Sequence, residues 1–154
     1  MSKYQATIDW HCDGSTFTDN RYPRSHRWLF DGGVEVPASS SPQVVPLPMS
    51  RADAVDPEEA FVASLASCHM LWFLSIAAAR GYRVNAYRDT AVGVMSRNEE
   101  DKLAITKVTL RPHVEFIGSN RPDAAALQAL HEAAHDSCFL AASVKSQVCC
   151  EPEG

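Results

Sequence analysis

Residues 55–69 read VDPEEAFVASLASCH, and they open the longest apolar segment of the chain. Asp56 can accept hydrogen bonds as the N-cap of a helix, and Pro57 suits the first helical position. Glu59 completes a capping box with Asp56. These signals predict a helix that runs to about Arg80. Because nearly every residue in it is apolar or small, we expect a central core helix that is buried on most sides.

The alternative for this segment is a membrane-spanning helix, which needs about 20 apolar residues. Residues 60–79 are long enough, and nearly all of them are apolar or small. However, His69 lies in the middle, and serines occur at positions 64, 67 and 75. The rest of the chain alternates like a soluble sheet protein. We therefore expect a soluble protein with no membrane partner.

Before this helix, the sequence predicts a small sheet. Apolar residues alternate with mostly polar ones over Tyr4–Trp10, which is the period of a strand with one buried face. The glycines of Asp31–Gly33 predict a hairpin between Arg27–Phe30 and Val34–Val36, because glycine permits positive φ. Four prolines and three consecutive serines in Pro37–Pro48 predict an extended loop.

After the helix, which we expect to end at Gly81, a long hairpin and a second helix are predicted. Strand-like runs extend over Val84–Met95 and Leu103–Phe116, with the most polar stretch of the chain between them. A stripe of alanine and leucine predicts a helix over Pro122–Ser137. Alternating residues over Val144–Val148 predict a closing strand.

Length and composition fit one globular domain. The chain has 154 residues, of which 45% are hydrophobic, so we expect a single α+β domain, residues 1–154, with antiparallel sheets around the central helix. The formal net charge is -5, so the acidic side chains outnumber the basic ones that would neutralise the phosphates of a nucleic acid. We therefore expect no nucleic-acid partner. The five cysteines are widely spread, and no signal peptide is recognisable. We therefore expect reduced thiols and a cytoplasmic protein.

Residues 131–135 read HEAAH, a match to the H-E-x-x-H pattern of zinc proteases on a predicted helix. His131 and His135 would face the same way, with Glu132 as the general base for a zinc-bound water. The third histidine of the extended metzincin pattern is missing, which leaves Cys138 or acidic residues near the C-terminus as the third ligand. We therefore expect a polar helix face with two solvated histidines and no bound metal.

Cys68 and Cys138 are the candidates for thiol chemistry. Cys68 belongs to an apolar stripe of the predicted helix, where a buried and inert thiol is one interpretation. Cys138 closes the second predicted helix, and a thiol pair from two helices is how a peroxide-reducing site would be assembled. The stripe consists of Phe61, Leu65, Cys68, Trp72 and Ile76.

A nucleophilic cysteine also needs a cation nearby, because free cysteine has a pKa of about 8.5 and only the thiolate attacks. The N-terminus of the predicted helix lies too far from Cys68 to serve, since the ten residues from Glu58 span about 15 Å. Arg21, Arg24 and Arg27 are the available cations.

Two stretches give the chain a family resemblance. Val55–His69 is similar to the N-P-E signature and spaced cysteine of the OsmC/Ohr family of hydroperoxide-reducing proteins, with Asp56 in place of the asparagine. Tyr22–Trp28 resembles the run of tyrosine, arginine and histidine before a tryptophan strand in the OsmC-like subgroup. The second cysteine, Cys138, also fits, and Phe139 stands where the family usually has proline.

The resemblance implies an intertwined α+β homodimer, with two sites at the dimer interface. It also implies a cysteine-based peroxidase that reduces organic hydroperoxides to alcohols in oxidative stress defence. Cys68 would be the peroxidatic thiolate, which becomes a sulfenic acid and then a disulfide with the resolving Cys138. Glu58 would be the signature carboxylate and Arg24 the activating arginine, with the two neighbouring arginines as alternatives.

The family resemblance further implies no bound cofactor and an external dithiol reductant, of the lipoyl type or on a lipoylated protein. One arginine would be nearly fully stretched to reach both Glu58 and Cys68, so we expect the glutamate or the arginine to come from the partner chain. The apolar side chains expected around the thiol, Phe61, Leu65 and Trp72, would favour an organic hydroperoxide as substrate.

Two other functions stay open on the sequence. A noncatalytic ligand-binding or stress-associated protein with the same fold would show neither paired thiol oxidation nor metal. A zinc hydrolase would bind metal through His131 and His135. Cys12, Cys149 and Cys150 receive no role.

Overall fold

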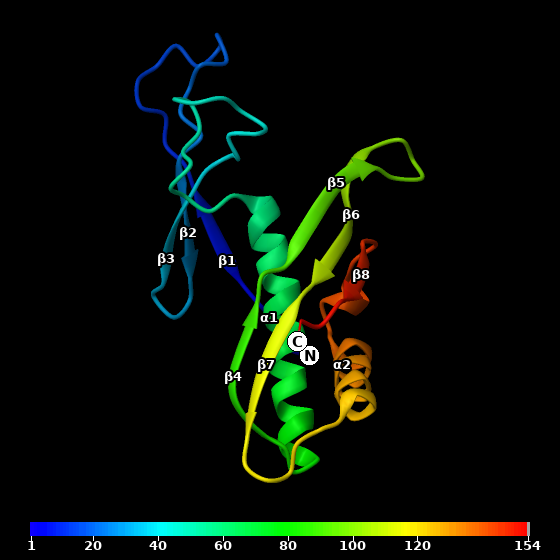
Figure 1. Cartoon of the computed structure of the whole chain (residues 1–154). Helices are drawn as coiled ribbons and strands as arrows, with labels where there is room; N and C mark the ends of the chain where they lie inside the picture. Colours follow the sequence, from blue (N-terminus) through cyan, green and yellow to red (C-terminus); the bar gives the residue numbers. More distant parts are fainter. Residues whose placement is uncertain (154) are drawn as a thin grey trace. The chain divides into compact units, whose positions relative to one another are not determined.

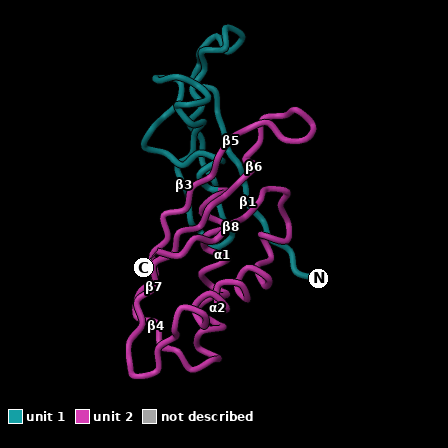
Figure 2. The backbone as a smooth tube through the Cα atoms, turned by 45° about the vertical axis from the view of Figure 1, so that its right-hand side comes forward, with its two compact units in different colours: residues 1–60 teal, residues 61–154 magenta. Residues whose placement is uncertain are grey.

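The computed structural model describes residues 1–153 (Figure 1), and Gly154, the last residue of the predicted domain, lies outside them. The chain forms two compact units, residues 1–60 and 61–154, coloured separately in Figure 2, and the division falls within the first helix. The elements in chain order are β1 (Ala6–Asp9), β2 (His26–Phe30), β3 (Glu35–Ala38), α1 (Pro57–Ala79), β4 (Arg83–Asp89), β5 (Val92–Arg97), β6 (Leu103–Leu110), β7 (Pro112–Ile117), α2 (Ala124–Ser137), the short 3-10 helix η1 (Ala141–Ser143) and β8 (Gln147–Cys150).

The first unit contains a three-stranded antiparallel sheet in the order β1-β2-β3. The predicted hairpin between β2 and β3 is confirmed, and Gly33 takes the positive φ of 89° that its turn needs. The first strand was predicted to have one buried face. This prediction is wrong for the single chain, because Ile8 is 62% exposed. Alternation decides which residues share a face of a strand, but burial also needs a second layer over that face.

The predicted loop after β3 is confirmed as irregular backbone fixed to the sheet. Ser39 donates its N–H to the carbonyl of Val55 at 3.0 Å, and Val55 donates to the carbonyl of Pro37 at 2.9 Å. Ser39 and Ser50 are buried. These bonds hold the segment just before α1 against the end of β3.

The start and the end of α1 follow the predicted signals. The N–H of Asp56 donates to Glu59 Oε1 at 2.9 Å, and the N–H of Glu59 donates to Asp56 Oδ1 at 2.8 Å, which is the capping box. Gly81 then takes a φ of 83°, where an L side chain would be strained, and the helix stops before it. Asn120 donates to the carbonyl of Gly81 at 3.1 Å.

The prediction that this helix is buried on most sides is wrong for the single chain. By length and composition α1 is apolar enough to cross a membrane, but only 28% of its most apolar window is buried. The buried face consists of residues four apart, which are Leu65, His69, Phe73 and Ala77. The opposite side, which includes Leu71 at 60% exposure, remains open. Composition without an amphipathic pattern could not indicate which side packs.

The second unit contains two sheets, one of β4 and β7 and one in the order β5-β6-β8 (Figure 1). The long hairpin is confirmed, but each predicted run is split into two strands, at residues 90–91 and at Arg111. The strands pair in antiparallel fashion as predicted, except that β8 pairs with β6 in parallel. The chain passes through β7 and α2 before β8, and this long connection allows it to return in the same direction as β6.

Two hydrophobic clusters in this unit position α1 and α2. Phe73 and Ala77 of α1 pack on Leu130 and Ala134 of α2, with side chains of β4 and β7 around them. Leu65 lies two turns earlier on α1 and packs on Val108 and Leu110 of β6. Asp123 caps α2 by accepting from the N–H of Ala126 at 2.8 Å. The second helix therefore lies against α1 with its C-terminal end near the middle of α1.

Candidate active site

The side chains of Cys68 and Cys138 meet, although the two residues are 70 positions apart in the chain. Cys68 comes from the middle of α1, and Cys138 is the C-cap residue of α2. Their sulfur atoms lie 2.7 Å apart, with the thiol of Cys138 donating to the sulfur of Cys68, and both cysteines are free thiols. The structure thus brings two of the predicted site residues into direct contact.

The two thiols have different surroundings. Cys138 is 3% exposed, and the N–H of Ala141 donates to its sulfur at 3.4 Å. Burial raises the pKa of Cys138, and the hydrogen bond with Cys68 raises it further, against the smaller lowering effect of the backbone N–H groups of Ala141 and Leu140. Cys138 therefore keeps its proton at neutral pH and serves as a hydrogen-bond donor. Cys68 is half-buried.

Apolar side chains surround the thiol pair on both helices. The ring of Trp72, one turn after Cys68, meets the ring of Phe139 edge to face at a centroid distance of 5.4 Å, and Phe139 is 69% exposed. Leu65, in contrast, is 1% exposed and belongs to the core with Phe61 packed against it. Of the three side chains predicted to meet a substrate, Trp72 and Phe61 are half-buried and Leu65 is buried.

Glu58 and Arg24 both lie in the first unit, and the structure does not pair them. Among the described residues, Glu58 Oε2 is shielded from solvent and has no hydrogen-bond partner. The guanidinium of Arg24 donates to Asn20 Oδ1 at 3.0 Å and lies 3.5 Å from the ring centroid of Tyr22. A contact between Glu58 and Arg24 is therefore not formed within the single chain, and the expectation that one of the two comes from a partner chain stays a prediction.

The two alternative arginines have other surroundings. Arg27 lies on β2 between two carboxylates, with Asp9 at 2.9 Å and Glu35 at 3.2 Å. Such pairs at the surface contribute little to stability, but they do hold the guanidinium on the sheet. Arg21 is exposed. Arg24 is thus the half-buried arginine of the three, held by neutral groups only.

A second cluster of reactive side chains lies beside the thiol pair, one residue along α1. His69 Nε2 is 3.0 Å from His131 Nδ1 of α2, and the two rings are parallel within 9°. Cys150 of β8 places its sulfur 3.8 Å from His69 Nε2. Burial lowers the pKa of His69 to about 4, helped by His131 and His135, and burial alone lowers the pKa of His131 to about 4. Both imidazoles are therefore neutral at pH 7.

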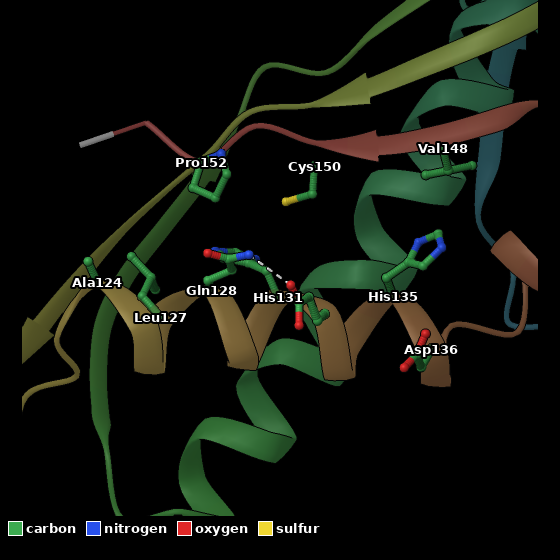
Figure 3. A pocket seen from close by; sticks show the side chains of 10 residues that line it. Ala124, Leu127, Gln128, His131, His135, Asp136, Val148, Cys150 and Pro152 are labelled. Carbon is green, nitrogen blue, oxygen red and sulfur yellow. Dashed lines mark hydrogen bonds between the residues drawn. The ribbon is translucent and has the colours of Figure 1, made fainter.

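A cavity of about 480 Å³ adjoins this cluster between α2 and β8 (Figure 3). His131, His135 and Cys150 are among its lining residues. The prediction of two solvated histidines is wrong for His131, which is 3% exposed, while His135 is exposed as predicted. His131 is buried because it follows Leu130 on the face of α2 that packs on α1.

Comparison with known proteins matches residues 50–153 to the family described as OsmC-like protein. The chain belongs to this family. An OsmC-like protein of unknown function from Vibrio cholerae has 50% sequence identity, with 99% of this chain and 100% of that chain covered and a TM-score of 0.98. No curated protein matches the chain significantly.

More distant OsmC-like structures share the fold. An organic hydroperoxide resistance protein from Elizabethkingia anophelis has 15% identity and a TM-score of 0.71, with 99% of this chain and 94% of that chain covered. The organic hydroperoxide resistance protein OhrB of Bacillus subtilis has 18% identity and a TM-score of 0.68, with coverages of 97% and 98%. The family and its α+β fold, both predicted from the sequence, are confirmed.

The cluster of His69, His131 and Cys150 in this OsmC-like chain was not predicted from the sequence. One signal was present, because His69 follows Cys68 and is four residues after Leu65, on the face that packs. The partners of His69 lie 62 and 81 residues away along the chain. No local pattern brings them together, and only the packing of α2 and β8 on α1 does so.

Proposed function

We propose that this OsmC-like protein is a thiol-dependent peroxidase that reduces organic hydroperoxides to alcohols. The observation that carries the proposal is the direct contact of two reduced thiols from different helices, with sulfur atoms 2.7 Å apart. A disulfide can form between such residues with little movement of either helix. Family membership supports the proposal, since more than one structural neighbour is described as an organic hydroperoxide resistance protein.

The proposed cycle has three balanced steps. The thiolate of Cys68 attacks the terminal oxygen of the hydroperoxide, the O–O bond breaks, and the alkoxide takes a proton and leaves as the alcohol. Cys68 is then a sulfenic acid. The sulfur of Cys138 attacks the sulfenic sulfur, and the thiol proton leaves with the hydroxyl group as water, which gives the disulfide. An external dithiol of the lipoyl type reduces the disulfide and is itself oxidised to a cyclic disulfide.

The polarity of the thiol pair supports these roles. Cys68 is the acceptor in the hydrogen bond between the two sulfurs, which is the role that a thiolate can fill. Cys138 is the donor and stays protonated, because burial raises its pKa. The donor thiol also lies where it must be for attack on a sulfenic acid at Cys68. We therefore assign Cys68 as the peroxidatic cysteine and Cys138 as the resolving one.

The apolar side chains near the pair support an organic substrate. Trp72 and Phe139 form an aromatic edge, and the ring of Phe139 is largely exposed. Phe61 lies on the same helix two turns before Cys68 and packs against Leu65. Such a surface gains free energy from the alkyl or aryl part of an organic hydroperoxide, which hydrogen peroxide lacks.

We further propose that the protein acts as a homodimer in the cytoplasm. Glu58 has a carboxylate oxygen that is shielded from solvent and has no hydrogen-bond partner among the described residues. Such an oxygen lowers the stability of the fold unless a hydrogen-bond donor reaches it. An arginine of a second copy, Arg24 in the first instance, would supply that donor and would stabilise the Cys68 thiolate. The exposed apolar side of α1 at Leu71, and Ile8 of β1, support the burial of these faces against a second copy.

Turnover measurements with single cysteine variants test the peroxidase. We expect reduced lipoamide to sustain the reduction of cumene hydroperoxide by the wild-type protein, with slower reduction of hydrogen peroxide. Cys68→Ser loses all turnover, while Cys138→Ser consumes about one equivalent of peroxide and then stops. Cys149→Ser, the matched control, keeps wild-type turnover. Equal rates in Cys68→Ser and in the wild-type protein would overturn the proposal.

A mixed-dimer experiment tests the cross-chain assignment. Glu58→Ala and Cys68→Ser subunits are mixed, exchanged and assayed for turnover. If glutamate and cysteine of opposite chains form one site, the mixture contains dimers with one intact site and is more active than either parent. A mixture no more active than its parents contradicts the cross-chain site and leaves the thiol chemistry of the previous test unaffected.

A further inference from the structure

The cluster of His69, His131 and Cys150 stands outside the proposed peroxidase cycle. Its members come from α1, α2 and β8, and one possible ligand atom of each lies within 4.8 Å of the other two. Two are buried and the third is partly buried. Nitrogen and sulfur atoms so close together, with no carboxylate among them, are typical of sites for thiophilic cations.

The distances agree with tetrahedral coordination of zinc. Zn–N bonds of about 2.05 Å and Zn–S bonds of about 2.3 Å place neighbouring ligands about 3.3 Å apart for two nitrogens and about 3.6 Å for nitrogen and sulfur. The nitrogens of His69 and His131 are 3.0 Å apart, and the sulfur of Cys150 is 3.8 Å from His69 Nε2. The third pair of ligand atoms, from His131 and Cys150, lies within 4.8 Å, so these two side chains would move together by up to about 1 Å to complete the three-ligand geometry.

Two buried imidazole nitrogens face each other in this cluster. His69 and His131 are both buried, and His69 Nε2 and His131 Nδ1 share one hydrogen bond. An ion between these facing nitrogens would be bound by both of them. Nε2 of His131 lies on the other edge of the ring, has no partner among the described residues and is not one of the proposed ligand atoms.

We propose that His69, His131 and Cys150 bind one Zn²⁺ ion per chain. The cavity lined by His131 and Cys150 gives access from solvent and leaves a fourth position for water or another ligand (Figure 3). On binding, the S–H bond of Cys150 breaks, an S–Zn bond forms and the proton passes to the buffer. This site differs from the zinc-protease interpretation of HEAAH, because His135 lines the same cavity but is not one of the three ligands.

Metal titration of the reduced full-length protein tests the site. Co²⁺ is the spectroscopic probe, because a cobalt–thiolate bond gives charge-transfer absorption in the near ultraviolet. Zn²⁺ affinity is measured by competition with a chromophoric chelator. We expect one equivalent of either ion per chain and the thiolate band. Cys150→Ser loses the band and binds Zn²⁺ about 100-fold more weakly, whereas Cys149→Ser, the neighbouring cysteine on the same strand, behaves as the wild-type protein.

Further variants separate this site from other thiols and histidines. His135→Gln and Cys68→Ser are expected to keep the single tight equivalent, since neither residue is a proposed ligand. X-ray absorption of the zinc-loaded wild-type protein requires no variant to fold, and one sulfur with two imidazole nitrogens is expected. No tight equivalent in the wild-type protein, an unchanged band in Cys150→Ser, or two sulfur ligands would overturn the proposal. None of these results bears on peroxide turnover, so the two proposals can fail separately.

Discussion

Gly93 of β5 lies close to Val62 of α1, and we expect Gly93→Ala to destabilise the protein. A Cβ atom at this position would lie 2.6 Å from Val62 Cγ2 and 3.3 Å from Ile105 Cγ2. The backbone of Gly93 has no positive φ, so the whole effect comes from space and none from backbone strain.

The size of the effect follows from how far the neighbours must move. Carbon atoms pack at about 3.5–4.0 Å, so α1 or Val62 must retreat by about 1 Å. Valine in a helix has one strongly preferred rotamer and cannot easily turn away. Overpacking of this kind typically costs about 1–3 kcal/mol. Because Val62 and Cys68 share α1, the same shift would also misplace the thiol of Cys68 relative to Cys138.

Urea unfolding monitored by tryptophan fluorescence measures the change, with Gly32→Ala as the matched control. A Cβ at Gly32 would meet nothing within 4 Å, and its φ is not in the positive region. We expect Gly32→Ala to stay within about 0.5 kcal/mol of the wild-type protein, while Gly93→Ala loses about 1–3 kcal/mol. Equal unfolding free energies for the two variants would refute the close packing of β5 on α1.

Three further predictions concern the two helices. Leu65→Ala removes a core side chain, which is 1% exposed, and should cost about 2–5 kcal/mol in urea unfolding; a loss no larger than that of the Gly32→Ala control would contradict the assigned packing face. Asp123→Ala removes the N-cap of α2 and should lower the unfolding free energy by about 1 kcal/mol. Asp123→Asn should lower it by much less, because asparagine can also cap a helix. Equal unfolding free energies for the two variants would show that the cap is not formed. In sedimentation experiments Leu71→Glu should weaken self-association, and an unchanged dimer would place the interface elsewhere.

Local signals were enough to predict α1, α2 and the first hairpin. Asp56 and Glu59 act within one turn, and Gly33 and Gly81 act through their own backbone angles, so the sequence around each contains the whole cause. The split of each long strand was not predictable in this way. At Arg111 the break has no glycine, and it arises because the two halves pair with different partners, β6 with β5 and β8, and β7 with β4.

The candidate site depended more on distant packing. A pair of Cys68 and Cys138 was expected from the family resemblance, and the structure places the two sulfurs in contact. The pairing of Glu58 with Arg24 is not formed within one chain. The helix spacing of Glu58 and Cys68 had led us to expect that one of the two residues comes from a partner chain, and that pairing stays a prediction. The burial of His131 was also missed, because HEAAH describes ligands on one helix, while the partners of His131 lie on α1 and β8.

Peptide mapping after a short exposure to one equivalent of cumene hydroperoxide tests the central claim most directly. The account predicts a rapid disulfide between Cys68 and Cys138, slower formation of the same bond with hydrogen peroxide, and reduced Cys149 and Cys150 in the same sample. Cys68 that stays reduced while the peroxide persists, or a disulfide that joins Cys138 to another cysteine first, would contradict it.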